Sequence, residues 1–181
     1  MLVLIGASAS GKTEIAKLLT TAFGYKKIVT NTTREKRVNE INGVDYNFLS
    51  YDDFLDKKNR NYFIETALYG GNYYGTAFKD AIDKSVLIVE PEGANNIIKH
   101  NIPNVYIVYL ETKESTRKQR MISRGDSLVD ITNRINTDKI HFNSKNISHI
   151  DYIINTSEKS TVELTKIIND KHQKNLEKKE L

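Results

Sequence analysis

Residues 1–19 read MLVLIGASASGKTEIAKLL, and this segment determines how the rest of the chain can fold. The apolar run from Leu2 to Ile5 leads into a loop of the pattern G-x-x-x-x-G-K-[ST], and a helical apolar periodicity follows. Glycines at both ends of such a loop let successive backbone N–H groups point inward, and the next helix adds its positive end. This combination predicts a P-loop between a buried strand and a helix, and therefore a site for a nucleoside triphosphate.

The residue types within the loop fit that chemistry. Lys12 can reach the terminal phosphates, and the Thr13 hydroxyl can ligate Mg²⁺. The predicted donor site comprises Gly6, Ala7, Ser8, Ala9, Ser10, Gly11, Lys12 and Thr13.

The composition is that of an ordinary globular protein. The 181 residues are enough for one sizeable core, and the net charge of +4 suits polyanionic small molecules without requiring nucleic acid or a membrane. The chain has no cysteine, which excludes disulfides and thiolate metal sites. No apolar run approaches the ~20 residues of a membrane span, and no signal-type segment precedes the first strand, so we expect a cytoplasmic protein.

Strands and helices alternate after the P-loop. We predict strands at 2–5, 25–30, 86–89, 105–110 and 150–154, and helices at 12–22, 78–84, 94–100, 113–124, 129–143 and 162–176. This order is typical of a parallel central sheet with helices on both faces, the three-layer α/β fold of P-loop NTPases. The charged tail, 171–181, is expected to fray.

The segment 31–78 breaks this alternation. It is polar, rich in tyrosine, and marked by turns at Asn42-Gly43 and Gly70-Gly71-Asn72, with one helix expected at 52–58. We interpret it as an insertion with a small core of its own. The predicted organisation is a core made of 1–30, 79–116 and 144–181, the insertion 31–78, and a lid at 117–143.

The blocks TNTTREKRVNEINGVDYNFLSYDDF and FIETALYGGNYYGTAF resemble the acceptor-binding insertion of guanylate kinases. The resemblance covers nearly the whole chain: the P-loop, the insertion, an acidic turn after the third strand, an arginine-bearing lid and a final strand ending in Asn. It implies transfer of the γ-phosphoryl group of ATP to GMP or dGMP with Mg²⁺, giving ADP and GDP in purine nucleotide metabolism. The implied partners are these nucleotides, without nucleic acid or membrane, and the implied assembly is a monomer or homodimer.

The resemblance also implies an acceptor site. Thr30, Arg34, Arg37, Tyr46 and Tyr74 would hold the 5′-phosphate of the monophosphate, since guanidinium forks and hydroxyls are its natural donors. It also implies four positions that contact the guanine base: Glu65, Gly75, Thr76 and Glu90. A buried carboxylate that accepts from guanine would be left unpaired by adenine, so rejection of adenine should be strong.

The turn after the third strand departs from the family pattern, which is close to D-x-D-x-Q-G. Here Ile88 takes the first acidic position and Glu90 the second, with Pro91-Glu92 before Gly93. Glu90 can still accept from the guanine amino group, but Ile88 cannot help to hold Mg²⁺ through water.

The arginines cluster in a chain that otherwise favours lysine. Seven of the 27 basic residues are arginines, and four of them, Arg117, Arg120, Arg124 and Arg134, flank the polar loop 125–130. By resemblance, Arg124 and Arg134 reach the transferred phosphoryl group when the lid closes, with Arg120 assisting, and Asn155 contacts the donor's adenine. The attacking phosphate oxygen is already anionic, so in-line transfer requires no general base.

Two other readings remain open at this stage. One is a related kinase that phosphorylates another nucleoside monophosphate or a sugar phosphate, which the altered turn favours. The other is a guanylate-kinase-like domain that binds without catalysis, which loss of Lys12 or of the lid arginines would have favoured.

Overall fold

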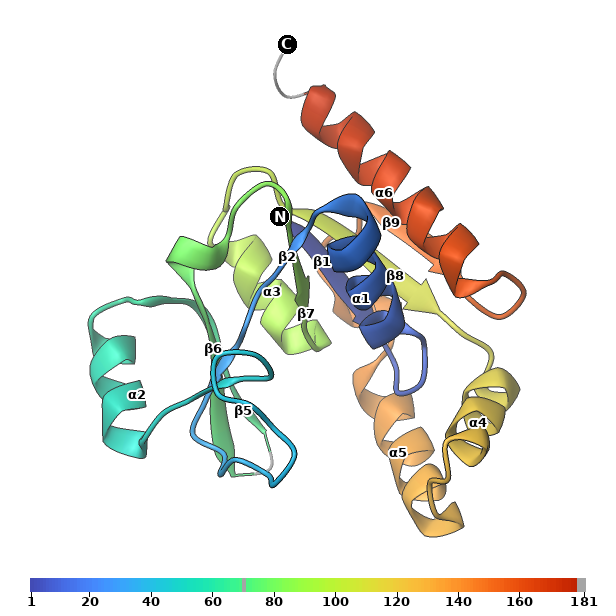
Figure 1. Cartoon of the computed structure of the whole chain (residues 1–181), viewed down its shortest axis with the longest axis horizontal. Helices are drawn as coiled ribbons and strands as arrows, with labels where there is room; N and C mark the ends of the chain where they lie inside the picture. Colours follow the sequence, from blue (N-terminus) through green and yellow to red (C-terminus); the bar gives the residue numbers. More distant parts are fainter. Residues whose placement is uncertain (70, 179–181) are drawn as a thin grey trace.

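The structure is a computed structural model that describes residues 1–69 and 71–178. A parallel five-stranded sheet, in the order β2-β7-β1-β8-β9, forms its centre. The strands are β1 (Leu2–Gly6), β2 (Lys26–Lys27), β7 (Ser85–Ile88), β8 (Tyr106–Glu111) and β9 (Tyr152–Asn155). The helices that cover it are α1 (Lys12–Phe23), α3 (Pro91–Lys99) and α6 (Thr161–Glu177), as Figure 1 shows. The predicted three-layer α/β fold is confirmed.

Alternate residues of β1 belong to different cores. Leu2 and Leu4 pack in a cluster with residues of α1 and α6, whereas Val3 and Ile5 pack in a cluster with residues of α3. This alternation follows from the two-residue period of a strand, and it explains why β1 is apolar throughout.

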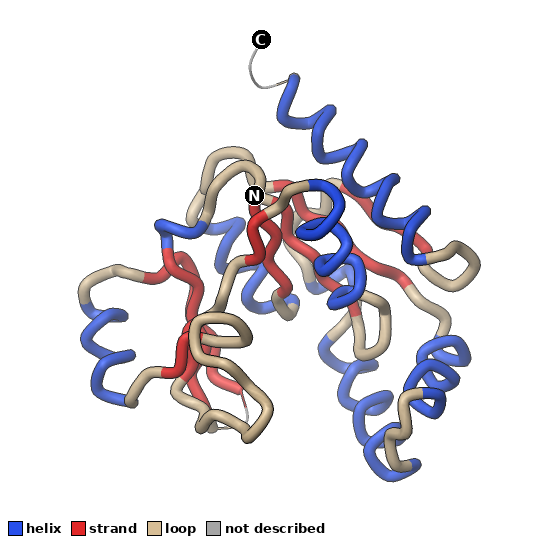
Figure 2. Tube along the Cα trace, in the orientation of Figure 1, coloured by secondary structure: helices blue, strands red, loops and turns tan. Residues whose placement is uncertain are grey.

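The insertion folds around a second sheet, in the order β4-β3-β6-β5. Its elements are β3 (Asn31–Thr32), β4 (Asn47–Phe48), α2 (Tyr51–Asn59), β5 (Phe63–Tyr69) and β6 (Asn72–Ala77). Phe54 of α2 is fully buried and stacks on Phe63 with ring centroids 4.6 Å apart. In Figure 2 this part stands to one side of the central strands.

Two helices, α4 (Glu114–Ser123) and α5 (Leu128–His141), form an antiparallel hairpin on the other side of the loop after β1 (Figure 1). Met121, Ile131 and Ile135 form its own small core, against which Ala9 of the P-loop packs. Two 3₁₀ turns, Phe78–Asp80 and Ser144–Asn146, complete the chain.

Several predicted boundaries were wrong. The second strand covers only Lys26–Lys27, because the chain then leaves the sheet edge for the insertion. The helix expected at 78–84 is the single 3₁₀ turn, and α3 begins at Pro91, three residues earlier than predicted, since proline suits the first turn of a helix.

The tail differs from its prediction as well. Instead of fraying from residue 171, α6 continues to Glu177, because His172 is buried and its Nδ1 lies 2.7 Å from the Tyr25 hydroxyl. Residues 179–181 of that predicted tail, and Gly70 of the predicted turn, lie outside the described residues.

Candidate active site

The P-loop has the backbone geometry that its glycines predict. Gly11 precedes α1 with φ of 100°, a conformation that side-chain-bearing residues rarely adopt. Gly6 lies so close to β8 that a Cβ there would be 2.8 Å from the Leu110 carbonyl oxygen. The loop therefore requires glycine at both ends for physical reasons.

Lys12 lies across the loop. Its ammonium group donates to the carbonyl oxygens of Gly6 and, at 3.0 Å, of Ala7. Burial lowers the Lys12 pKa to about 8, and the negative charges of Asp138 and Glu90 partly oppose this shift. The cation is thus held at the beginning of the loop, in a place where it lacks full solvation. Thr13 follows at the exposed first turn of α1.

Side chains from α4 and from the residues that directly follow β8 and β9 hold the P-loop in place. The Thr156 hydroxyl donates to the Ser10 carbonyl at 3.1 Å and pairs with the Thr112 hydroxyl at 2.6 Å. Arg120 donates to the carbonyl oxygens of Ala9 at 3.1 Å and Thr156 at 2.7 Å. The structure therefore brings Arg120 to the P-loop through backbone contacts.

An ion pair that the sequence analysis missed lies beside these contacts. Arg117 Nη1 and Asp138 Oδ2 are 2.6 Å apart, and both side chains are buried. Asp138 also accepts hydrogen bonds from the backbone N–H and the hydroxyl of Ser8. A signal was present: each residue falls on the apolar stripe of its helix, Arg117 four before Met121 and Asp138 three after Ile135.

The other two lid arginines lie away from the P-loop. Arg124 is bound to Asp126, with Nε at 2.8 Å from Oδ1, and this contact lowers the Asp126 pKa. Arg134 is exposed and contributes a weaker positive field at the same carboxylate. The structure thus brings Arg124 and Arg134 to one acidic group at the tip of the hairpin.

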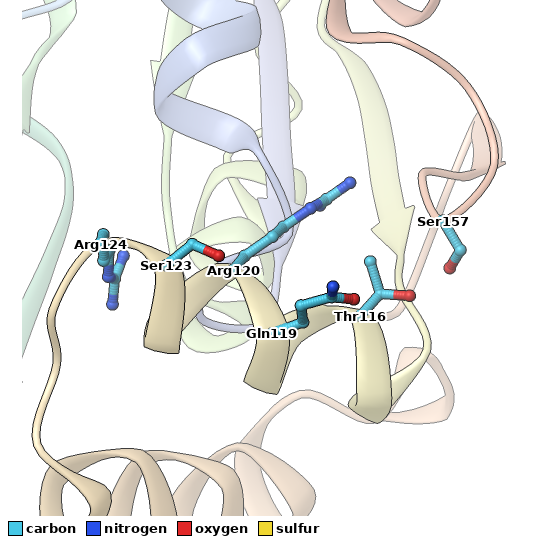
Figure 3. Close-up of a pocket in the computed structure, with 6 residues that line it drawn as sticks. All are labelled: Thr116, Gln119, Arg120, Ser123, Arg124 and Ser157. Atoms are coloured by element: carbon cyan, nitrogen blue, oxygen red, sulfur yellow. The ribbon is translucent and has the colours of Figure 1, made fainter.

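An open cleft of about 500 Å³ lies between α4 and the loop after β9 (Figure 3). Its lining consists of Thr116, Gln119, Arg120, Ser123, Arg124 and Ser157. In Figure 3 Arg120 and Arg124 point in different directions from the same helix. Asn155 accepts a hydrogen bond from the Ser157 N–H at 2.8 Å, so it shapes the loop that borders the cleft.

The predicted phosphate-binding residues of the insertion partly assemble. The Arg34 guanidinium lies over the Tyr46 ring at 5.3 Å, and Tyr46 meets Tyr74 edge to face at 6.0 Å. Glu40, which the sequence analysis did not single out, binds Arg34 at 2.6 Å and the Arg37 backbone N–H at 2.9 Å. The carbonyl of the half-buried Thr30 accepts from Asn47 where the chain enters this sheet.

Glu65 and Thr76 form a buried pair on the neighbouring strands β5 and β6. The Thr76 hydroxyl donates to Glu65 Oε1 at 2.8 Å, and burial raises the Glu65 pKa. A Cβ on Gly93 would lie 3.4 Å from Glu65 Oε2, so the first turn of α3 lies against the carboxylate. Gly75 is equally confined, since a Cβ there would be 2.9 Å from the Phe63 ring.

The two carboxylates of the turn after β7, Glu90 and Glu92, act on different groups. Burial raises the Glu90 pKa, and the positive charges of His141 and Lys12 partly oppose this shift. The carboxylate whose charge acts on Glu65 is Glu92. The charge of Glu90 thus acts on the P-loop lysine, while the sequence analysis assigned Glu90 to the acceptor site with Glu65.

Comparison with known proteins gives one consistent family. The family model described as guanylate kinase matches residues 1–171. A guanylate kinase of Clostridium acetobutylicum is 36% identical over 132 residues, which span 69% of this chain and 63% of that protein. One from Syntrophus aciditrophicus is 31% identical over 175 residues, or 92% and 84% of the two chains.

Solved structures agree in fold. The crystal structure of a guanylate kinase from Anaplasma phagocytophilum superposes with a TM-score of 0.64 at 23% identity, covering 94% of this chain and 82% of that one. An uncharacterized protein from Eubacterium ventriosum gives a TM-score of 0.52 at 15% identity, covering 96% and 98%.

Proposed function

The chain belongs to the guanylate kinase family, and on that basis we propose that it transfers the γ-phosphoryl group of ATP to GMP or dGMP, giving ADP and GDP. It is thus an ATP:GMP phosphotransferase that acts in purine nucleotide metabolism. The observation that carries the proposal is the buried Glu65–Thr76 pair at the first turn of α3, in a chain that also has a complete P-loop.

The pair supports recognition of guanine. A carboxylate accepts hydrogen bonds only, and guanine offers two donor groups, N1–H and N2–H₂, side by side. Adenine offers no donor at N1, so the Glu65 oxygen that Thr76 does not bind would remain buried without a donor from the base, at a penalty of about 1–3 kcal/mol or more for a charged group. Thr76 fixes one carboxylate oxygen and so holds Glu65 ready for the base.

The terminal phosphate of ATP and the phosphate of GMP meet between the insertion, 31–78, and the lid, 117–143. The donor side is Gly6 to Thr13 with Asn155 at the adenine, and the acceptor phosphate lies on Arg34, Arg37, Tyr46, Tyr74 and Thr30. Gly75 and Glu90 complete the acceptor site, with the charge of Glu90 also acting on Lys12. Segment 31–78 acts as the acceptor-binding unit and segment 117–143 as the lid.

Mg²⁺ would enter as part of the Mg-ATP substrate, where it would neutralise charge on the phosphates. Thr13, exposed at the start of α1, would supply a hydroxyl ligand to it. Ile88 offers no carboxylate at the end of β7, so Glu90 is the acidic residue closest in sequence that can act through water.

Transfer is a direct in-line displacement. Lys12, the loop amides and the lid arginines Arg120, Arg124 and Arg134 stabilise the charge shared by donor and acceptor phosphates. Closure of the lid and the insertion over the phosphates excludes water and so prevents hydrolysis of ATP.

The test is a coupled assay of ADP release with Mg-ATP and a panel of acceptors: GMP, dGMP, AMP, CMP, UMP and a sugar phosphate. We expect turnover with GMP and little with AMP, CMP or UMP. Equal rates with AMP would remove the base-reading argument. Turnover of another acceptor in place of GMP would favour the alternative that the Glu90-Pro91-Glu92 turn suggests, and no turnover at all would favour a binding module.

The proposal also covers the location and the assembly of the enzyme. None of the described helices is long and apolar enough to cross a membrane. We place the enzyme in the cytoplasm, where ATP and GMP occur, as a monomer or homodimer that acts on small nucleotides and not on nucleic acid.

A further inference from the structure

A carboxylate from the lid occupies the phosphate-binding loop. Asp138 Oδ2 accepts a hydrogen bond from the Ser8 backbone N–H at 3.0 Å, and Oδ1 accepts one from the Ser8 hydroxyl at 3.2 Å. The Asp138 residue is only 5% exposed, although it belongs to α5 and lies 130 positions further along the chain. The P-loop therefore already holds an anion, and that anion is part of the protein.

Arg117 of α4 completes this anion site. Its Nη1 donates to Asp138 Oδ2 at 2.6 Å and to the Ser8 carbonyl at 3.4 Å. A guanidinium presents several N–H donors in one plane and binds carboxylate and phosphate oxygens equally well. The donors around Asp138 are thus those that a phosphate group also requires.

The position of Lys12 indicates which end of the loop is concerned. Its ammonium group lies at the carbonyl oxygens of Gly6 and Ala7, at the beginning of the loop, and a P-loop lysine contacts the β- and γ-phosphates. Ser8 is the next residue. The Ser8 N–H, Arg117 and Lys12 therefore surround the end of the loop where the terminal phosphate of ATP binds.

We propose that Asp138 stands in the place of the terminal phosphate in the nucleotide-free protein, and that ATP displaces it and takes over Arg117 as a phosphate ligand. The inference rests on the proposed function, because it needs a triphosphate donor. It makes Arg117 a substrate-binding residue and Asp138 a positioning residue that holds Arg117 in place until the donor arrives.

Displacement follows from the contacts. A single Ser8 N–H cannot serve a carboxylate and a phosphate together, and two anions at this distance repel each other. Arg117 is buried, so it needs an anionic partner in either state, and the phosphate supplies one when Asp138 leaves. Because Arg117 and Asp138 lie on the two helices of the hairpin, arrival of ATP also releases the bond that ties α5 to the P-loop.

The test compares two nucleotides by calorimetric titration with Mg²⁺: ADP, which lacks the terminal phosphate, and the non-hydrolysable β,γ-imido analogue of ATP. Asp138→Asn keeps the shape of the side chain but removes the competing charge. We expect it to bind the analogue about tenfold more tightly than the wild type does, with ADP affinity changed less than about twofold. The control Asp170→Asn makes the same change of charge on the exposed side of α6 and should shift neither affinity.

Arg117→Lys supplies a second measurement, which decides the question if Asp138→Asn does not fold. Lysine keeps the charge without the planar fork, so the analogue should bind about tenfold more weakly while ADP binding stays within about twofold. A role confined to bracing the helices would alter both nucleotides equally in both variants. That result, or weaker binding of the analogue by Asp138→Asn, would overturn the inference.

The same preparations separate the inference from the proposed function. A wild-type protein that binds neither nucleotide, or transfers no phosphoryl group from ATP to GMP, defeats the proposed function. If the wild type transfers the phosphoryl group normally but the variants keep the wild-type ratio of analogue to ADP affinity, only the displacement of Asp138 is contradicted.

Discussion

Lys12 and Glu65 are buried ionisable groups, and burial moves the pKa of each toward its neutral form. The Lys12 pKa falls to about 8, whereas the Glu65 pKa rises. Both groups are expected to act in their charged forms, one on phosphate and the other on guanine. Each should therefore impose its own limit on the pH range in which the protein works.

For Lys12 the limit is on the alkaline side. The ammonium form is lost as the pH rises through about 8, so kcat/KM for ATP, which reports the free enzyme, should fall above that pH. Lys12→Arg should be less active at every pH but should give a flat profile to pH 10, because arginine stays protonated. The measurement is the initial rate at saturating GMP between pH 6 and 10; a fall at pH 8 that persists in Lys12→Arg would assign it to another group.

For Glu65 the limit is on the acidic side. A protonated carboxyl offers guanine one acceptor fewer, so KM for GMP should rise as the pH falls through the raised Glu65 pKa. Glu65→Gln should lower kcat/KM for GMP about 100-fold and abolish that part of the pH dependence. Glu92→Gln, an exposed change of the same charge nearby, is the matched control and should change kcat/KM less than about threefold. Equal losses in the two variants would show a general charge effect.

Among the elements, the residue that directly follows β9 supports the P-loop. Thr156 is fully buried, and its hydroxyl joins the Ser10 carbonyl to the Thr112 hydroxyl. The shape of the loop thus depends on a strand that is distant in sequence. Arg120 reinforces the connection, because it binds the carbonyls of Ala9 and Thr156 together.

Thr156→Val keeps the volume of the side chain and removes this connection. The variant should lose about 1–3 kcal/mol of unfolding free energy, because Ser10 and Thr112 lose their buried partner. KM for ATP should rise while KM for GMP stays the same. Thr20→Val removes an exposed hydroxyl on α1 and should stay within about 0.5 kcal/mol in the same denaturant titration. An equal rise of both KM values would place the effect outside the P-loop.

The helices and strands also show which parts of the fold sequence patterns can predict. Continuous apolar runs and the helical periodicity located the central strands and most helices, since both are local signals. The start of α3 at Pro91 depends on local capping and was mispredicted. The helix at 162–176 was predicted, but its order through His172, where fraying was expected, depends on a contact with Tyr25. The helical periodicity could have marked Arg117 and Asp138 as buried, but the two residues are 21 positions apart, so no local pattern could pair them.

At the scale of the whole molecule, the predicted site is not yet assembled. Glu65 and Arg34 lie in the insertion, Lys12 in the central body, and Arg124 at Asp126 near the tip of the hairpin. The family resemblance proposes which residues take part, because it is carried by residue types at fixed offsets. It could not predict their distances, which depend on how the insertion and the hairpin stand around the central sheet.

The proposed closure of the lid therefore requires Arg124 to separate from Asp126. Arg124→Ala should lower kcat about 10²–10³-fold with little change in KM for GMP, as expected for a group that acts only on the transferred phosphoryl group. Asp126→Asn frees Arg124 without removing it and should leave kcat equal or higher. A comparable loss of kcat in both variants would mean that catalysis requires the intact Arg124–Asp126 ion pair. Small-angle scattering should also show a smaller radius of gyration with the ATP analogue and GMP together than with neither.

The hairpin of α4 and α5 contains hydrophobic residues of its own, Met121, Ile131 and Ile135, and meets the P-loop through Ala9. A segment with private packing can melt and reform while the remainder of the protein stays folded. Substitutions among these three hydrophobic residues can therefore change how often the hairpin opens without changing the residues of the P-loop itself.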